Sequence, residues 1–291
     1  MCKTGIFSLF FHSFLFVQLA LANTQSCERL LQPGWRHSES RIVQRLLDLP
    51  TRSIALRKLE KRWQALEVLK GQIRWLELKD ETFQEVRDEI NELRMELSST
   101  LRGDRLTETF DWAQETQTAR ENWVKVENLL YKWIKAGREL DGEAILALNE
   151  SLCTGLRNND KLPGKIRNHA LNIDGEGYFI HSEDAAYALE EFVAWYHRNK
   201  SQMHPIEFAA RAYQRLVSYH PFSDGNGRTS RAVMDWILLK NGYPPAAFVS
   251  AQDGVVAIFV EPNQKAPSPE AVVNTLTQAI ENTFRLLLTI L

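Results

Sequence analysis

Residues 220–231 decide the fold, and they read His220-Pro221-Phe222-Ser223-Asp224-Gly225-Asn226-Gly227-Arg228-Thr229-Ser230-Arg231. Gly225 and Gly227 can adopt backbone angles that other residues avoid, so the loop can turn its amide N–H groups inward where a helix begins. Such a nest of amides at a helix N-terminus binds phosphate. Arg228 and Arg231 lie on one face of that helix, where their guanidinium groups can reach further phosphate oxygens.

Two other side chains of the segment supply chemistry. Asp224 offers a hard oxygen ligand beside the phosphates, as Mg²⁺ bound to a nucleotide requires. His220 is the only group of the segment whose ordinary pKa suits proton abstraction near neutral pH. Taken singly, these residues fit a helix end, a turn and a solvated helix face. Their combination within one short segment favours a nucleotide phosphate site instead.

Common nucleotide-binding signatures do not explain the segment. The Gly-Lys-Ser/Thr ending of a P-loop is absent from it, and no strand-helix-strand pattern surrounds its glycines. The segment instead resembles, position for position, the Fic family motif His-x-Phe-x-Asp/Glu-Gly-Asn-Gly-Arg-x-x-Arg. The resemblance extends over about residues 144–248, including a proline-glycine-x-x-arginine tract at 163–167 and the penultimate helix of the family at 204–210.

The resemblance implies a protein adenylyltransferase that uses ATP as substrate and Mg²⁺ as cofactor. In this assignment His220 is the general base that deprotonates a Ser, Thr or Tyr hydroxyl of a target protein, and Asp224 holds Mg²⁺. AMP is transferred and pyrophosphate leaves. The implied nucleotide-binding residues are Gly225, Asn226, Gly227, Arg228 and Arg231. Asp235 stands where many relatives have asparagine, which leaves the base preference open.

A β-hairpin is predicted from short extended runs on either side of glycine-bearing turn residues. It resembles the target-docking flap of the family, which pairs with an extended target segment through main-chain hydrogen bonds. The flap residues are Asn172, Ile173, Asp174, Gly175, Glu176, Gly177, Tyr178, Phe179 and Ile180.

A second family feature is predicted near the end of the sequence. Thr277, Glu281 and Asn282 fit the inhibitory pattern Ser/Thr-x-x-x-Glu-Gly/Asn. The resemblance implies that Glu281 pairs with Arg231 and blocks a productive γ-phosphate position. The alternative is a solvated glutamate on a terminal amphipathic helix.

Helical periodicity dominates the remaining sequence. From about residue 40 to 136, apolar residues recur at three and four positions, which predicts three or four amphipathic helices. The fold class is therefore all-α: a Fic-type helical bundle with a small hairpin flap, preceded by an amphipathic helical region. The expected divisions are a signal peptide (1–22), a helical N-terminal region (23–140), and a Fic domain with a C-terminal inhibitory helix (141–291).

Composition and the first residues bear on partners and location. Lysine and arginine total 35 against 37 acidic residues, so charge gives no reason to expect nucleic acid. Lys3, an apolar run and Ala20-Leu21-Ala22 are typical of a signal peptide, which predicts a secreted protein or one in a secretory compartment, including a host-directed effector. An uncleaved membrane anchor is the alternative.

Several functions remain open at this stage. The same fold could remove AMP, or transfer UMP or a phosphocholine group. A non-catalytic interaction protein is the alternative of a different class. The expected partner is a protein with a hydroxyl side chain, and the N-terminal helices could pack on the catalytic domain, bind a partner or form a homodimer.

Overall fold

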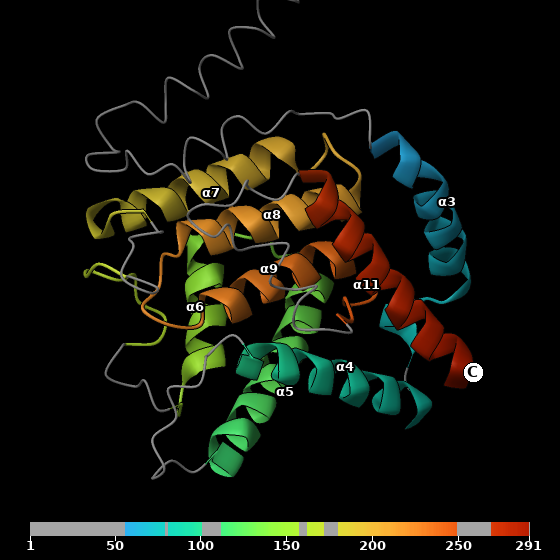
Figure 1. Cartoon of the computed structure of the whole chain (residues 1–291), viewed down its shortest axis with the longest axis horizontal. Coiled ribbons are helices and arrows are strands. Elements are labelled where there is room, and N and C mark those ends of the chain that lie inside the picture. Colours follow the sequence, from blue (N-terminus) through green and yellow to red (C-terminus); the bar gives the residue numbers. More distant parts are fainter. Residues whose placement is uncertain are drawn as a thin grey trace, which may run out of the picture.

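The computed structural model describes residues 56–78, 81–100, 112–156, 162–171, 180–248 and 269–290. This part of the chain is an all-α bundle, which confirms the predicted fold class (Figure 1). The signal segment and flap residues 172–179 lie outside the described residues. The helices are α3 (Leu56–Gln72), α4 (Glu81–Thr100), α5 (Trp112–Lys135), α6 (Gly142–Cys153), α7 (Ala185–Asn199), α8 (Pro205–Tyr219), α9 (Asn226–Lys240) and α11 (Pro269–Ile290), with 3-10 turns η1 (Trp75–Glu77) and η3 (Ser182–Asp184).

The centre of the bundle is the pair α8 and α9. The sequence marks where α8 begins, because Pro205 occupies its first turn and the Nδ1 atom of His204 accepts a hydrogen bond from the amide of Ile206. Helix α9 is buried along nearly its whole length, between α8, α6 and α5. The loop that joins α8 to α9 is therefore attached to two helices that are themselves packed against α5 and α6 or against each other.

Helix α6 reaches this loop from a separate part of the chain. Asp141 caps α6 by accepting a 2.7 Å hydrogen bond from the amide of Ala144, which is an N-cap arrangement. Ala144, Ile145, Leu148 and Leu152 form its buried apolar face. The C-terminal half of α6 lies beside the start of α9 (Figure 1).

The described residues of the predicted N-terminal region form three helices, as expected from periodicity. Helix α3 packs on α11, and α4 packs on both α11 and α5. Arg62 of α3 binds three polar side chains of α11, while the indole of Trp63 donates a 3.0 Å hydrogen bond to Thr277. Trp63 also stacks on His204 with ring centroids 4.2 Å apart. These contacts join α3 to the bundle formed by α11 and α8.

Within the described ranges, no helix combines the length and apolar character needed to cross a membrane.

Candidate active site

His220 ends α8 in an unusual backbone conformation. It has φ +49°, in the left-handed region, and its amide still closes the helix by donating to the carbonyl of Leu216. Its ring Nδ1 lies 2.9 Å from the carbonyl oxygen of Val217. Since a carbonyl can only accept, Nδ1 carries the proton and the lone pair lies on Nε2. Nε2 is therefore the atom that can act as a base.

Burial sets the proton affinity of this imidazole. Desolvation lowers the pKa of His220 to about 4, and the positive charge of Arg167 acts in the same direction. The Val217 carbonyl and the negative charge of Asp224 oppose the shift. His220 is therefore neutral at physiological pH, as a general base must be.

Gly225 makes the sharp turn that begins α9. Its φ of +76° lies in the left-handed region, and an added Cβ would overlap the Sγ atom of Cys153. A side chain is thus excluded both by conformation and by space. Gly225 caps α9 without a side-chain hydrogen bond, so the first amides of the helix have no acceptor within it. This is the geometry of an anion site.

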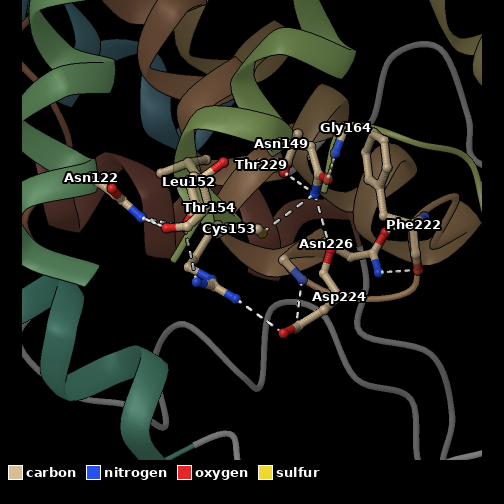
Figure 2. Close-up of polar contacts among 12 residues, drawn as sticks. Asn122, Asn149, Leu152, Cys153, Thr154, Gly164, Phe222, Asp224, Asn226 and Thr229 are labelled. Atoms are coloured by element: carbon tan, nitrogen blue, oxygen red, sulfur yellow. Dashed lines mark hydrogen bonds and ion pairs between the residues drawn. The ribbon is translucent and has the colours of Figure 1, made fainter. Parts of the chain in front are cut away.

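Asn149 of α6 ties the loop to its surroundings (Figure 2). Its amide nitrogen donates to the Asp224 carbonyl at 3.0 Å and to the Thr229 hydroxyl at 3.1 Å, and its oxygen accepts from the amide of Gly164 at 2.9 Å. The side chain is almost fully buried. One residue therefore holds the turn at Gly164, the loop and the first turn of α9 together.

Asn226 closes the loop from inside. Its oxygen accepts from the amide of Phe222 and its nitrogen donates to the carbonyl of the same residue, at 2.9 and 2.8 Å (Figure 2). The sequence analysis expected Asn226 to grip phosphate. In the structure both polar ends of its side chain are engaged within the protein, so the side chain shapes the loop.

Asp224 and Arg228 lie at the mouth of the loop. One Asp224 oxygen accepts from the amide of Gly225, and the other lies 3.4 Å from an Arg228 nitrogen. The Asp224 side chain is 28% exposed, whereas Arg228 is buried and also donates to the Leu152 carbonyl at 3.1 Å. A single accessible carboxylate beside an open helix N-terminus fits Mg²⁺ that is held mainly by nucleotide phosphates.

Arg231 lies deeper, beneath the first turn of α9. It is 2% exposed, its guanidinium carbon lies 6.0 Å from the ring centroid of Trp123 on α5, and one of its nitrogens lies just under Gly227. Burial raises the pKa of the Tyr213 phenol, and the charge of Arg231 opposes that rise. Arg228 is thus positioned by α6, and Arg231 by α5 and α8.

Arg167 is a buried cation beside the loop. Its Nε donates to the His220 carbonyl at 2.7 Å, and its two terminal nitrogens donate to the carbonyls of His169 and Ile180. Its own amide donates to the Pro221 carbonyl at 2.9 Å. Desolvation lowers the pKa of the guanidinium.

The implied inhibitory pair is wrong in this structure. Both carboxylate oxygens of Glu281 accept from Arg62 of α3, at 2.7 and 2.8 Å, instead of meeting Arg231. The reason is packing: α11 lies on α8, α3 and α4, whereas Arg231 faces Trp123 of α5. The other two residues of the pattern also serve packing, since Thr277 accepts from Trp63 and Asn282 donates to the Ala247 carbonyl.

Sequence reasoning missed three supporting residues. Arg167 was noted only as part of a tract, although an arginine after a Pro-Gly turn was a usable signal. Asn149 and Trp123 lie in ordinary helical patterns, and nothing local distinguishes them. Their partners are 75 and 108 positions away at Asp224 and Arg231, so only the folded chain shows the contacts.

Comparison with known sequences agrees with this geometry. Residues 139–238 match the Fic/DOC family. A uridine 5'-monophosphate transferase from Xanthomonas campestris is 30% identical over 212 residues, which are 69% of this chain and 37% of that protein. The protein adenylyltransferase Fic of Drosophila ananassae is 44% identical over 70 residues, which are 24% of this chain and 14% of that protein. The chain thus spans well under half the length of these curated relatives.

Solved structures show the same fold. A Fic-domain-containing signalling protein from Bacteroides thetaiotaomicron has a TM-score of 0.57 at 20% identity, covering 81% of this chain and 96% of that one. Fic-1 from C. elegans has a TM-score of 0.60 at 18% identity, covering 80% and 72%. The described helices therefore adopt the all-α Fic fold, and the chain is a Fic-domain protein.

Proposed function

We propose that this protein transfers a nucleoside monophosphate from a nucleoside triphosphate to a Ser, Thr or Tyr hydroxyl of a target protein. The observation that carries the proposal is the left-handed turn at His220, which puts a neutral imidazole five residues before Gly225, the residue that caps the open N-terminus of α9. A base and an anion site on one short loop match the needs of phosphoryl-type transfer, where positioning and charge neutralisation dominate.

The residues of the chain divide the work. The Nε2 atom of His220 accepts the proton of the target hydroxyl, so that its oxygen can attack the α-phosphorus while pyrophosphate leaves. The first amides of α9, with Arg228 and Arg231, bind the phosphates and stabilise the charge that develops there. Asp224 would hold Mg²⁺, which supplies further neutralisation of the phosphate oxygens.

ATP is the proposed donor and AMP the transferred group. The similarity to an animal protein adenylyltransferase, 44% identical over 70 residues, supports this choice. UTP is the second candidate, because the bacterial uridine monophosphate transferase matches a much larger share of the chain. Asp235 does not decide between them: it is buried and accepts a hydrogen bond from the amide of Ala246, so it supports the turn after α9.

The target protein is proposed to dock through the flap region, in a secreted or secretory-compartment setting. The N-terminal sequence supports the location, and the family resemblance supports the docking mode. A hydroxyl-bearing protein remains the expected partner.

The test uses the full chain, as wild type and as His220→Ala, with Mg²⁺ and either ATP or UTP labelled at the α-phosphate. Intact-mass measurement follows self-modification, and labelled proteins are followed in a lysate. We expect label from one nucleotide in wild type and none in His220→Ala, with nucleotide binding retained in both. The mass added to the protein distinguishes AMP from UMP. Folded wild type that neither binds nor transfers either nucleotide would favour an interaction protein.

A further inference from the structure

Arg167 makes a set of contacts that packing alone does not require. Its guanidinium donates to three backbone carbonyls, of His169, Ile180 and His220, that come from three different stretches of chain. Buried arginine normally binds a carboxylate or a phosphate, because its charge is costly to desolvate. Here the planar guanidinium of Arg167 instead fixes the backbone at His220, the proposed general base.

The His220 backbone needs such a tie. A non-glycine residue in the left-handed region is sterically unfavourable and persists only where its surroundings hold it. The side chain of Arg167 holds the His220 carbonyl, its amide holds the Pro221 carbonyl, and Ile166 forms an antiparallel bridge with Phe222. The short tract 166–167 therefore braces the backbone on the C-terminal side of the imidazole.

The nucleotide loop is held by different residues. Asn149 binds Asp224 and Thr229, and Asn226 binds Phe222. None of the contacts from Arg167 reaches Gly225, Gly227 or the two motif arginines among those described. The guanidinium of Arg167 thus contacts the base half of the site, whereas Asn149 and Asn226 hold the anion-site half. The two sets of contacts meet at Phe222, which Ile166 bridges and Asn226 binds.

We propose that Arg167 is a positioning residue for His220: its guanidinium holds the left-handed turn that aims Nε2 at the target hydroxyl. The same guanidinium ties this turn to the backbone at His169 and Ile180. This inference rests on the proposed function. It assigns Arg167 to the proton-abstraction half of the site and leaves nucleotide binding to the Asn149 network.

The experiment compares Arg167→Met and Arg167→Lys with Lys165→Met, which removes an exposed charge from the same tract. The full chain is used throughout. Nucleotide affinity is measured by calorimetry with the Mg²⁺ complex of ATP or UTP, and the rate of transfer is followed at saturating nucleotide as a function of pH. Thermal unfolding reports the folded fraction.

We expect Arg167→Met to lower the transfer rate about 100-fold while the nucleotide Kd is unchanged, since small displacements of a catalytic group cost rates of this order. Arg167→Lys keeps the charge but cannot serve three carbonyls, so its rate should fall similarly. The pH profile of Arg167→Lys should stay near that of wild type. In Arg167→Met the acid limb of the profile should shift to higher pH, because the charge of Arg167 lowers the pKa of His220 and the charge of Asp224 raises it.

Other results would overturn the inference. A wild-type rate in Arg167→Lys would show that charge alone is needed, and a parallel loss of rate and nucleotide affinity would show a general structural role. If Arg167→Met does not fold, Arg167→Lys alone carries the test. Absence of transfer by the folded wild type would instead overturn the proposed function, and the inference with it.

Discussion

The sequence predicts two functional motifs, one in the loop between α8 and α9 and one at residues 277–282 of α11. The residues of the first motif lie together as predicted, whereas Glu281 of the second does not meet its predicted partner. In the loop, His220, Asp224 and the two motif arginines lie within one turn-and-helix unit, as the motif requires. On α11, Glu281 is held by Arg62, on the side of the bundle that carries α3.

The difference comes from how much of each motif is local. The loop motif specifies a left-handed glycine at Gly225, a helix start and side chains within one helical turn, and these features are decided by its own residues. The α11 pattern specifies three residues, of which Thr277 and Glu281 are four apart and share a face on any helix. Which neighbour that face meets depends on packing, and here Thr277 and Glu281 meet Trp63 and Arg62 of α3.

The strongest test of the loop assignment is His220→Ala. We expect a loss in transfer rate of about 10²–10⁴-fold, the usual contribution of a general base. Nucleotide affinity should remain, because the α9 amides are untouched. Single-turnover transfer and calorimetry measure the two quantities. His197→Ala, at an exposed position of α7, is the control and should change neither. Retained transfer in His220→Ala would break the assignment.

The second test targets the turn itself through Gly225→Ala and Gly137→Ala. Both glycines have positive φ, but only Gly225 would meet neighbouring atoms, those of Cys153 and Asn149. Gly137→Ala should cost about 1–2 kcal/mol for the left-handed backbone, and Gly225→Ala about 1–3 kcal/mol more for overpacking. Denaturant unfolding measures both.

Removal of the Cys153 sulfur sharpens this comparison. Cys153→Ala should recover part of the additional cost in the Gly225→Ala background, since the Sγ atom is the closest obstacle. Equal destabilisation by the two glycine substitutions would show that the loop is not tightly seated on α6.

A third test uses the lowered pKa of His220. Its pKa of about 4 in the folded protein lies below the ordinary 6.5. As the pH falls, His220 is therefore protonated in the unfolded chain before it is protonated in the folded one. The stability contributed by the neutral imidazole is complete above about 6.5 and is lost as the pH falls toward about 4. Comparing unfolding curves of wild type and His220→Gln over this range should show a weaker pH dependence in the variant. His197→Gln should follow wild type.

The smallest effect is expected on α11. Glu281→Ala should cost about 1 kcal/mol, because the pair with Arg62 is bidentate but partly exposed. The transfer rate should not rise. Arg62→Ala should cost somewhat more, because it also removes the hydrogen bonds to Asn274 and Gln278. The double variant should be no less stable than Arg62→Ala, since Glu281 has already lost its partner in that variant. Strong activation by Glu281→Ala alone would restore the inhibitory role.

Sequence reasoning recovered the fold class and the loop at which α9 begins. Periodicity located α3 to α5, and the glycines and arginines located the start of α9. It could not assign the side-chain tasks of Asn226 and Glu281, because their hydrogen-bond partners are set by tertiary packing. It also could not find Asn149, since a buried asparagine in an apolar helix has no local signature.

The order of contacts along the chain has a consequence for how the protein is made. The ties of the α8–α9 loop to Arg167 and Asn149 span 53 to 80 residues, whereas Arg62 and Glu281 are separated by 219. A growing polypeptide folds vectorially, and distant contacts form late. The loop can therefore assemble before α11 is synthesised, whereas α3 gains its partners only afterwards. Until then, the indole of Trp63 lacks its Thr277 acceptor.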